Sequence, residues 1–154
     1  MSLKMYQRIT AQVTALIESE PDMIANLANI SSLLNMELED INWVGFYLLK
    51  GDELVLGPFQ GNPACVRIPV GRGVCGTAIS ENTVQRIHDV HEFEGHIACD
   101  AQSNSEIVIP FTLNKQVVGV LDIDSPSIGR FSQEDEQGLV ELMKQVELIL
   151  QTHI

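Results

Sequence analysis

The chain has 154 residues, of which 45% are hydrophobic and 19% charged, so it is long enough to bury one sizeable core. Its formal net charge of −12 opposes binding to nucleic acids and anionic membranes, since both need clustered Lys and Arg. No window is apolar over the roughly 18 residues of a membrane span, and the N-terminal segment lacks the apolar core of a signal peptide. We therefore expect a single globular domain over residues 1–154.

Two helices are predicted at the N-terminus. Apolar residues recur at three- and four-residue steps over residues 3–18, which is typical of an amphipathic helix. The same spacing resumes after Pro21, where Glu20 or Asp22 would cap a second helix. Both helices should cover one side of a sheet.

An antiparallel hairpin is predicted next. Residues 41–49 have strand character with both faces partly buried, and a turn at 50–52 leads to a second strand over 53–59. Glycines and prolines from Gly57 to Pro63 then predict a long loop.

Residues 71–76, GRGVCG, formally match the glycine pattern of dinucleotide-binding folds. That pattern needs a βαβ unit and an acidic residue on a second strand about 20 residues on. Here it follows a hairpin and leads into the short segment 77–80, so we reject the dinucleotide interpretation. We expect these glycines to let the backbone turn tightly beside a site.

A short strand over 83–87 and a long polar loop over 88–105 are predicted to follow, and loops of this length are usually functional or disordered. The loop carries His88, His91, His96 and Cys99. Because the spacing lacks any CxxC or HxxxH element, we expect no metal site.

The C-terminal third contains the clearest β signal, a hairpin of strands 107–113 and 116–123 that turns at Asn114-Lys115. A final helix opens at Ser132, whose spacing to Asp135 is that of a capping box. The element order predicts an α+β fold, a mainly antiparallel sheet with helices packed on one side and active-site loops on the other.

Three cysteines are an odd number, which argues against a secreted disulfide framework and favours a reducing, cytoplasmic compartment. Cys65, Cys75 and Cys99 each stand beside glycine, proline or polar residues rather than inside an apolar run. We expect accessible thiols that form a redox site; inert structural thiols are the alternative.

The segment order, together with GVCGTAI, VVGVLDIDS and FSQEDEQGLVEL, resembles a GAF domain over nearly the whole chain. Within that superfamily, the cysteine spacing and the segments INWVGFYLL and GHIACDAQSNSEIVIP resemble the free methionine-R-sulfoxide reductases. The resemblance implies reduction of free L-methionine (R)-S-oxide without a cofactor, with thioredoxin as reductant. It leaves a homodimer open.

The resemblance also implies residue roles. The family's catalytic cysteine corresponds to Cys99, and its resolving cysteines correspond to Cys65 and Cys75. The aromatic wall of the substrate pocket corresponds to Trp43 and Tyr47, and the acidic ligands to Glu106, Asp122 and Asp124.

The chemistry agrees with these roles. A Cys99 thiolate would attack the electrophilic sulfur, methionine would leave, and the resulting sulfenic acid would condense with a second thiol to a disulfide that an external dithiol reopens. The carboxylates would bind the α-ammonium that peptide-bound methionine lacks. Glu106, with a pKa raised by acidic neighbours, is our first choice as general acid to the departing oxygen.

Strand register tests this hypothesis, because a one-residue slip reverses every side chain. A two-residue loop at Asn114-Lys115 would separate Glu106 from the aspartates. A three-residue loop would pair Glu106 with Asp124 and place all three acids on one face, and we predict this second arrangement.

Simpler interpretations exist for the same residues. The two aromatic residues would by default be core residues, and the two aspartates a solvated strand face. A non-catalytic GAF-type domain that senses a small ligand would have the same pocket without turnover. A thiol-based redox sensor would oxidise with peroxide but show no stereoselective reduction of sulfoxide.

Overall fold

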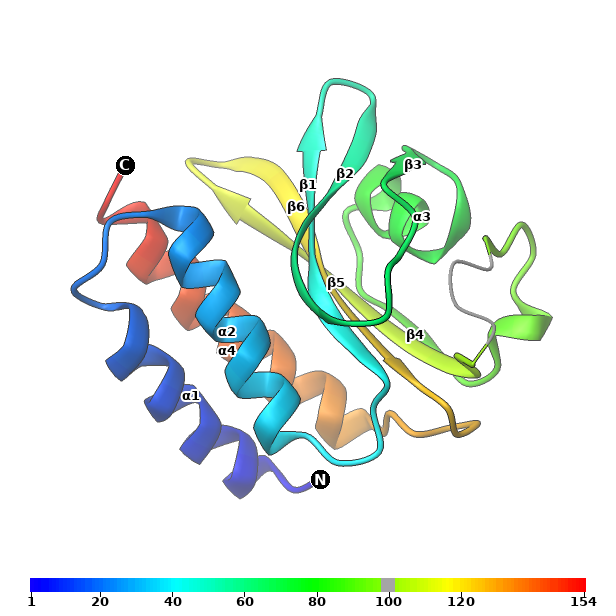
Figure 1. Ribbon diagram of the computed structural model, residues 1–154, viewed down its shortest axis with the longest axis horizontal. Coiled ribbons are helices and arrows are strands. Elements are labelled where there is room, and N and C mark those ends of the chain that lie inside the picture. Colours follow the sequence, from blue (N-terminus) through cyan, green and yellow to red (C-terminus); the bar gives the residue numbers. More distant parts are fainter. Residues whose placement is uncertain (98–101) are drawn as a thin grey trace.

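The computed structural model describes residues 1–97 and 102–154, shown in Figure 1. Within these ranges the elements in chain order are α1 (Leu3–Ile17), α2 (Met23–Glu37), β1 (Trp43–Lys50), β2 (Glu53–Gly61), β3 (Arg67–Pro69), α3 (Gly73–Glu81), β4 (Gln85–Ile87), the 3-10 helix η1 (Val90–Glu92), β5 (Ser105–Leu113), β6 (Gln116–Ser125) and α4 (Gln133–Gln151). The strands form one antiparallel sheet in the order β3-β2-β1-β6-β5-β4. The predicted α+β class is confirmed.

Side-chain caps fix where three helices begin. The Ser2 hydroxyl accepts a hydrogen bond from the first turn of α1, and the Asp22 carboxylate does so for α2. Glu20 instead accepts from the backbone N–H of Asp22, so Asp22 is the cap. The predicted capping box of Ser132 and Asp135 is present at the start of α4.

Alternation along the strands separates two cores. Val44 and Phe46 of β1 face α1, α2 and α4, whereas Trp43 and Tyr47 face α3 and the loops. Figure 1 shows the three long helices on one side of the sheet and α3 on the other. The predicted placement of helices and loops is therefore confirmed, with α3 as an additional helix on the loop side.

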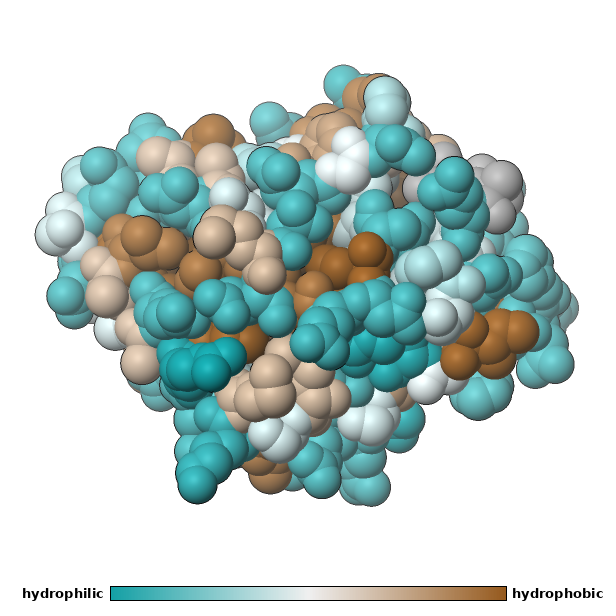
Figure 2. Space-filling model, turned by 60° about the horizontal axis from the view of Figure 1, so that its bottom comes forward, coloured by the Kyte–Doolittle hydropathy of each residue, from teal (hydrophilic) through white to brown (hydrophobic). Residues whose placement is uncertain are grey.

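The surface agrees with the acidic composition. Figure 2 shows a face that is mainly hydrophilic, with hydrophobic residues gathered near its centre. Among the described residues, no helix has the length and apolar composition needed to cross a membrane.

β2 is longer than predicted. It continues through Gly57 and Pro58 to Gly61, where a loop was expected. The register of β1 against β2 shifts between Gly45 and Tyr47, because Gly45 pairs with Phe59 and Tyr47 with Leu56. Gly57 and Pro58 lie at this bulge, where a proline without an N–H costs no ladder hydrogen bond.

The β5–β6 hairpin has the predicted register but not the predicted loop. The turn contains two residues, Asn114 and Lys115, both with positive φ (51° and 66°). A bulge near Val118 then shifts the register by one residue, so Glu106 pairs with Asp124. The predicted three-residue loop was wrong. The predicted pairing of Glu106 with Asp124 is present, but the bulge produces it rather than the loop.

The described ends of the predicted loop 88–105 are tied to the sheet. Ser105 is already part of β5, and the backbone N–H of Asn104 donates to the carbonyl of Ser125 at 2.8 Å. The Asn104 carbonyl accepts from Val90 of η1 at 2.9 Å. This network fixes one wall of the pocket described below.

Candidate active site

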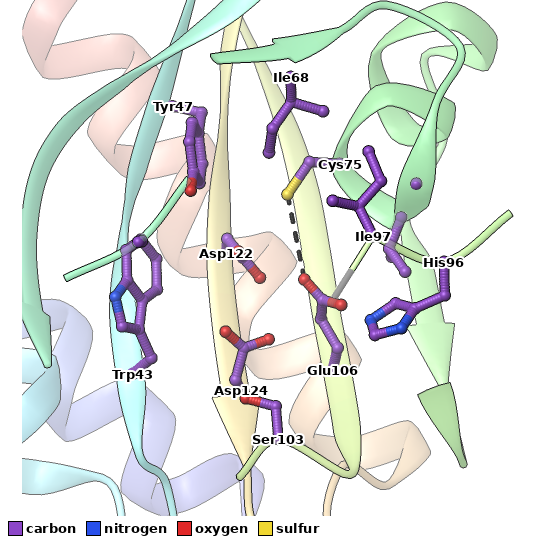
Figure 3. Close-up of a pocket in the computed structure, with 13 residues that line it drawn as sticks. Trp43, Tyr47, Ile68, Cys75, His96, Ile97, Ser103, Glu106, Asp122 and Asp124 are labelled. Atoms are coloured by element: carbon purple, nitrogen blue, oxygen red, sulfur yellow. Dashed lines mark hydrogen bonds between the residues drawn. The ribbon is translucent and has the colours of Figure 1, made fainter. Parts of the chain in front are cut away.

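A pocket opens on the face of the sheet that lies opposite the three long helices (Figure 3). Strands β1, β5 and β6 form its floor, and α3 and the flanking loops form its walls. Its lining residues are Trp43, Tyr47, Ala64, Ile68, Gly73, Val74, Cys75, His96, Ile97, Ser103, Glu106, Asp122 and Asp124. The predicted aromatic and acidic residues are all among them.

One wall is a stack of aromatic rings. Trp43 lies between Tyr47, at a centroid distance of 5.9 Å, and Phe59, at 5.2 Å, with interplanar angles of 23° and 14°. Trp43 and Tyr47 are each 2% exposed and lie on the same face of β1. The stack gives the pocket a rigid apolar side.

The opposite side of the floor carries the three acids. The strand register places Glu106 of β5 beside Asp124 of β6. Asp122 lies two residues before Asp124 in β6 and therefore on the same face. All three carboxylates are buried, and Oδ1 of Asp122 has no hydrogen-bond partner. A buried oxygen without a donor is costly, which indicates a site made for a ligand that donates.

Burial, followed by the charges of Asp122 and Asp124, raises the pKa of Glu106 well above its ordinary value. Burial also raises the pKa of Asp122, although hydrogen bonds with Glu106 and neighbouring groups oppose the shift. The predicted raised pKa of Glu106 is confirmed in direction. Glu106 is therefore suited to hold a proton that it could give to a departing oxygen.

Cys75 is not the accessible thiol that was predicted. It lies in α3 rather than in a loop, is 3% exposed, and lines the pocket from within the apolar cluster on this side of the sheet. Its Sγ donates to Oε2 of Glu106 at 4.0 Å. Burial, followed by the charges of Asp122 and Glu106, raises the pKa of its thiol well above the ordinary value, so Cys75 is a poor nucleophile at neutral pH.

The error came from the glycines that flank Cys75. They were taken to mark an irregular loop, but Gly76 allows close packing: a Cβ there would lie 2.5 Å from the carbonyl oxygen of Pro69. The missing side chain lets α3 pack directly against the end of β3, and this contact buries Cys75.

The other two cysteines differ from Cys75. Cys65 is half-buried on the segment between β2 and β3, and it is disulfide-bonded. It is not among the lining residues, but its neighbour Ala64 is. Cys99 lies outside the described residues.

Sequence reasoning missed several lining residues. His96 was considered as a metal ligand and interpreted as a loop residue, yet it lines the pocket, and burial lowers its pKa. Ile68, Ile97 and Ser103 gave no sequence signal, because only the folding of their loops brings them to the pocket. None of the described lining residues is Lys or Arg.

Within the described ranges, the candidate metal ligands are groups that already line this pocket. Among the described residues, the ligand atoms of Cys75, Glu106 and Asp122 lie within 4.8 Å of one another. A thiol and two carboxylates suit a divalent cation such as Zn²⁺. The histidines considered at the sequence level are not part of this group, and a metal-free site stays a prediction.

The curled antiparallel sheet, with a small pocket between its face and a short helix, is the arrangement of a GAF domain. Residues 27–151 match the GAF domain family. The chain is 61% identical over 147 residues to the free methionine-R-sulfoxide reductase of Escherichia coli (strain K12), and the alignment covers 96% of this chain and 89% of that protein.

Solved structures agree. The fRMsr of Staphylococcus aureus in its reduced form has a TM-score of 0.92 at 55% identity, with 94% of each chain covered. The free methionine-R-sulfoxide reductase of Neisseria meningitidis, in complex with its substrate, has a TM-score of 0.92 at 41% identity, covering 96% of this chain and 89% of that one. The chain belongs to the GAF domain family and, within it, to the free methionine-R-sulfoxide reductases.

Proposed function

We propose that this protein reduces free L-methionine (R)-S-oxide to L-methionine through cysteine chemistry. The observation that carries the proposal is the pocket itself, where the buried carboxylates of Glu106, Asp122 and Asp124 face an aromatic wall and Oδ1 of Asp122 is an open acceptor. Such a site selects a small ligand that has both a cationic group and an apolar part. Relatives whose names state this activity support the same substrate.

The acids account for the selection of the free amino acid. Asp122 and Asp124 offer charge-assisted hydrogen bonds to an α-ammonium group, and the unpartnered Oδ1 of Asp122 supplies a vacant acceptor. A methionine sulfoxide within a peptide has no such ammonium and would leave Oδ1 of Asp122 without a donor. Trp43 and Tyr47 enclose the S-methyl group.

The reaction begins with attack of the Cys99 thiolate on the sulfoxide sulfur. Glu106 donates a proton to the sulfoxide oxygen, methionine leaves, and Cys99 becomes a sulfenic acid. Because Glu106 keeps its proton at higher pH than an ordinary glutamate, it can serve as the acid under conditions in which a thiolate forms.

Cys65 is the first resolving thiol in this proposal. Its Sγ attacks the Cys99 sulfur, the S–S bond forms, the S–O bond breaks, and the oxygen leaves as water. Two observations favour Cys65 over Cys75: Cys65 is disulfide-bonded, and the thiol of Cys75 is buried beside carboxylates that disfavour its thiolate. In this proposal Cys75 acts after Cys65, by exchange with the first disulfide.

A dithiol reductant must reopen the disulfide, and thioredoxin is the proposed one. We also propose a cytoplasmic location, which the odd number of cysteines and the need for a dithiol reductant support. The net charge of −12 argues against nucleic acid or membrane as a partner, and a homodimer stays open. We also propose that residues 1–154 are one GAF-like domain, because α1, outside the matched range 27–151, packs on α4 and α2.

The test is a thioredoxin-coupled assay of NADPH consumption that compares the free R-sulfoxide, the free S-sulfoxide and a peptide sulfoxide. We expect turnover of the free R epimer alone, and loss of activity by about three orders of magnitude in Cys99→Ser. Full activity in Cys99→Ser would show that another group is the nucleophile.

The same assay separates the alternative function. A GAF-type sensor would bind a small ligand in this pocket and consume no NADPH with any sulfoxide. A thiol redox sensor would form its disulfide with peroxide but show no preference between the R and S epimers.

A further inference from the structure

The segment that carries Cys65 is held over the pocket by the aromatic wall. This segment, residues 62–66, connects β2 to β3 and is largely exposed. The Tyr47 hydroxyl donates to the backbone carbonyl of Cys65 at 2.9 Å, and Nε1 of Trp43 donates to the carbonyl of Asn62 at 3.1 Å. Each ring therefore has its polar end on the segment. Both rings also line the pocket, on the side that faces the acids (Figure 3).

Two further contacts fix the ends of the segment. The Val66 carbonyl accepts a hydrogen bond from the N–H of Leu56 at 2.9 Å. At the other end Gly61 has a φ of +139°, and a Cβ there would lie 2.6 Å from Cδ1 of Trp43. The chain thus turns closely over the indole ring, in a conformation that favours glycine.

The hydrogen bond from Tyr47 is made to Cys65 itself, the residue whose position determines whether the disulfide can form. Disulfide formation requires Cα atoms about 4.4–6.8 Å apart and a defined sulfur geometry, so a mobile backbone at Cys65 would slow the reaction. The Tyr47 hydroxyl is desolvated inside the pocket wall and makes its hydrogen bond to this carbonyl. Losing that bond would release the Cys65 backbone without changing the shape of the aromatic ring.

The Tyr47 hydroxyl holds the Cys65 carbonyl in the disulfide-bonded state. We infer that the same contact makes Tyr47 a positioning residue for the resolving step, in which the Cys65 thiol attacks the sulfenic acid. Trp43 supports the same segment at Asn62. This role is separate from the enclosure of the S-methyl group by the rings, and it rests on the proposed function. The aromatic wall that contacts substrate therefore also positions the Cys65 thiol for disulfide formation.

The test is a single turnover of Tyr47→Phe with one equivalent of free R-sulfoxide and no reductant. Methionine release reports attack by Cys99, and loss of free thiols reports disulfide formation. Because the ring also contacts substrate, the readout is the ratio of the two rates: we expect disulfide formation to slow about five- to tenfold relative to methionine release, the effect of one lost hydrogen bond on a rate. Sulfenic acid trapped by dimedone should accumulate in the variant.

Tyr6→Phe is the matched control. Tyr6 is equally buried, but its hydroxyl donates to Asp135 on the helix side of the sheet. Loss of this hydroxyl should leave the ratio of the rates of methionine release and disulfide formation unchanged. If Tyr47→Phe does not fold, Trp43→Phe removes the indole N–H from Asn62 and should slow the same step. In a Cys65→Ser background, Tyr47→Phe should cause no additional slowing, since its effect passes through Cys65.

Three outcomes would overturn the inference. Disulfide formation at the wild-type rate in Tyr47→Phe would show that the hydrogen bond does not position Cys65. Equal slowing of both steps would place the whole role of Tyr47 in substrate binding. If wild-type protein released no methionine, the proposed function would fail, and this inference with it.

Discussion

The two faces of the sheet both bury carboxylates, but they treat them in opposite ways. On the helix face, Asp135 is 1% exposed and accepts hydrogen bonds from Tyr6 at 2.5 Å, from Ser132 at 2.8 Å, and from Arg130 at 3.2 Å. Burial alone would raise its pKa, yet these hydrogen bonds, led by that of the Ser132 backbone, outweigh burial and lower it.

On the pocket face the neighbouring groups that shift the pKa values of Glu106 and Asp122 are other acids and a thiol. Glu106 and Asp122 are 7% and 5% exposed, close to the value for Asp135, but their pKa values are raised. Burial acts to raise the pKa on both sides: at Asp135 the hydrogen bonds outweigh it, at Asp122 the hydrogen bonds do not, and at Glu106 the neighbouring acids add to it. The helix face satisfies its charge internally, whereas the pocket face holds acids that a cationic ligand would satisfy.

The largest expected effect comes from removing the proton that Glu106 holds. Glu106→Gln keeps the shape of the side chain but cannot donate an acidic proton, so kcat/KM for the free R-sulfoxide should fall about 100- to 10,000-fold. Thermal unfolding should show no loss of stability. If Glu106→Gln kept activity within threefold of wild type, another group would be the acid.

A matched pair of substitutions tests the two faces against each other. Asp135→Asn removes the charge opposite the buried Arg130 and should lower the free energy of unfolding by about 3 kcal/mol. Asp122→Asn removes a charge that repels its neighbours and should raise it by about 1 kcal/mol. Urea unfolding measures both changes, and equal signs would contradict the comparison.

The smallest effect is a dependence of stability on pH. Because the folded-state pKa of Glu106 lies above its ordinary value of 4.5, the folded chain keeps a proton that the unfolded chain releases. This stabilisation is complete below about pH 4.5 and is lost as pH rises through the folded-state pKa, with a slope of at most about 1.4 kcal/mol per pH unit.

Urea unfolding between pH 5 and 8 should show this slope in wild type and a smaller one in Glu106→Gln. Asp135 acts in the opposite direction: its pKa is lowered, so its stabilisation is lost only as pH falls below 3.8. An identical slope in wild type and Glu106→Gln would exclude Glu106 as its source.

Features set by local chemistry could be predicted from the sequence. The boundaries of α1, α2 and α4 follow from apolar periodicity and from capping side chains such as Asp22 and Ser132. The face of the pocket acids followed from strand alternation, although only the family resemblance gave those acids a role.

Features set by packing could not be predicted. Helix α3 was missed because its glycines disfavour a helix in isolation, and only contact with β3 shows why they are there. The bulge in β6 left no sequence signal, so the correct register was predicted from an incorrect loop. The hydrogen bond between Tyr47 and Cys65 joins a strand to a loop 18 residues away, which no local pattern reports.

The bulge near Val118 also changes the phase of β6. Val117 and Val120 are three residues apart, which would place them on opposite faces of a regular strand, yet both belong to the pocket-side cluster. The alternation of residues between the two faces of the sheet is therefore different at the hairpin tip and at the end of β6 that carries the acids. Amino-acid changes at the hairpin tip can therefore alter the packing of the tip without changing the face on which Asp122 and Asp124 lie. The extra residue at the bulge separates the position of the acids from the conformation of the turn.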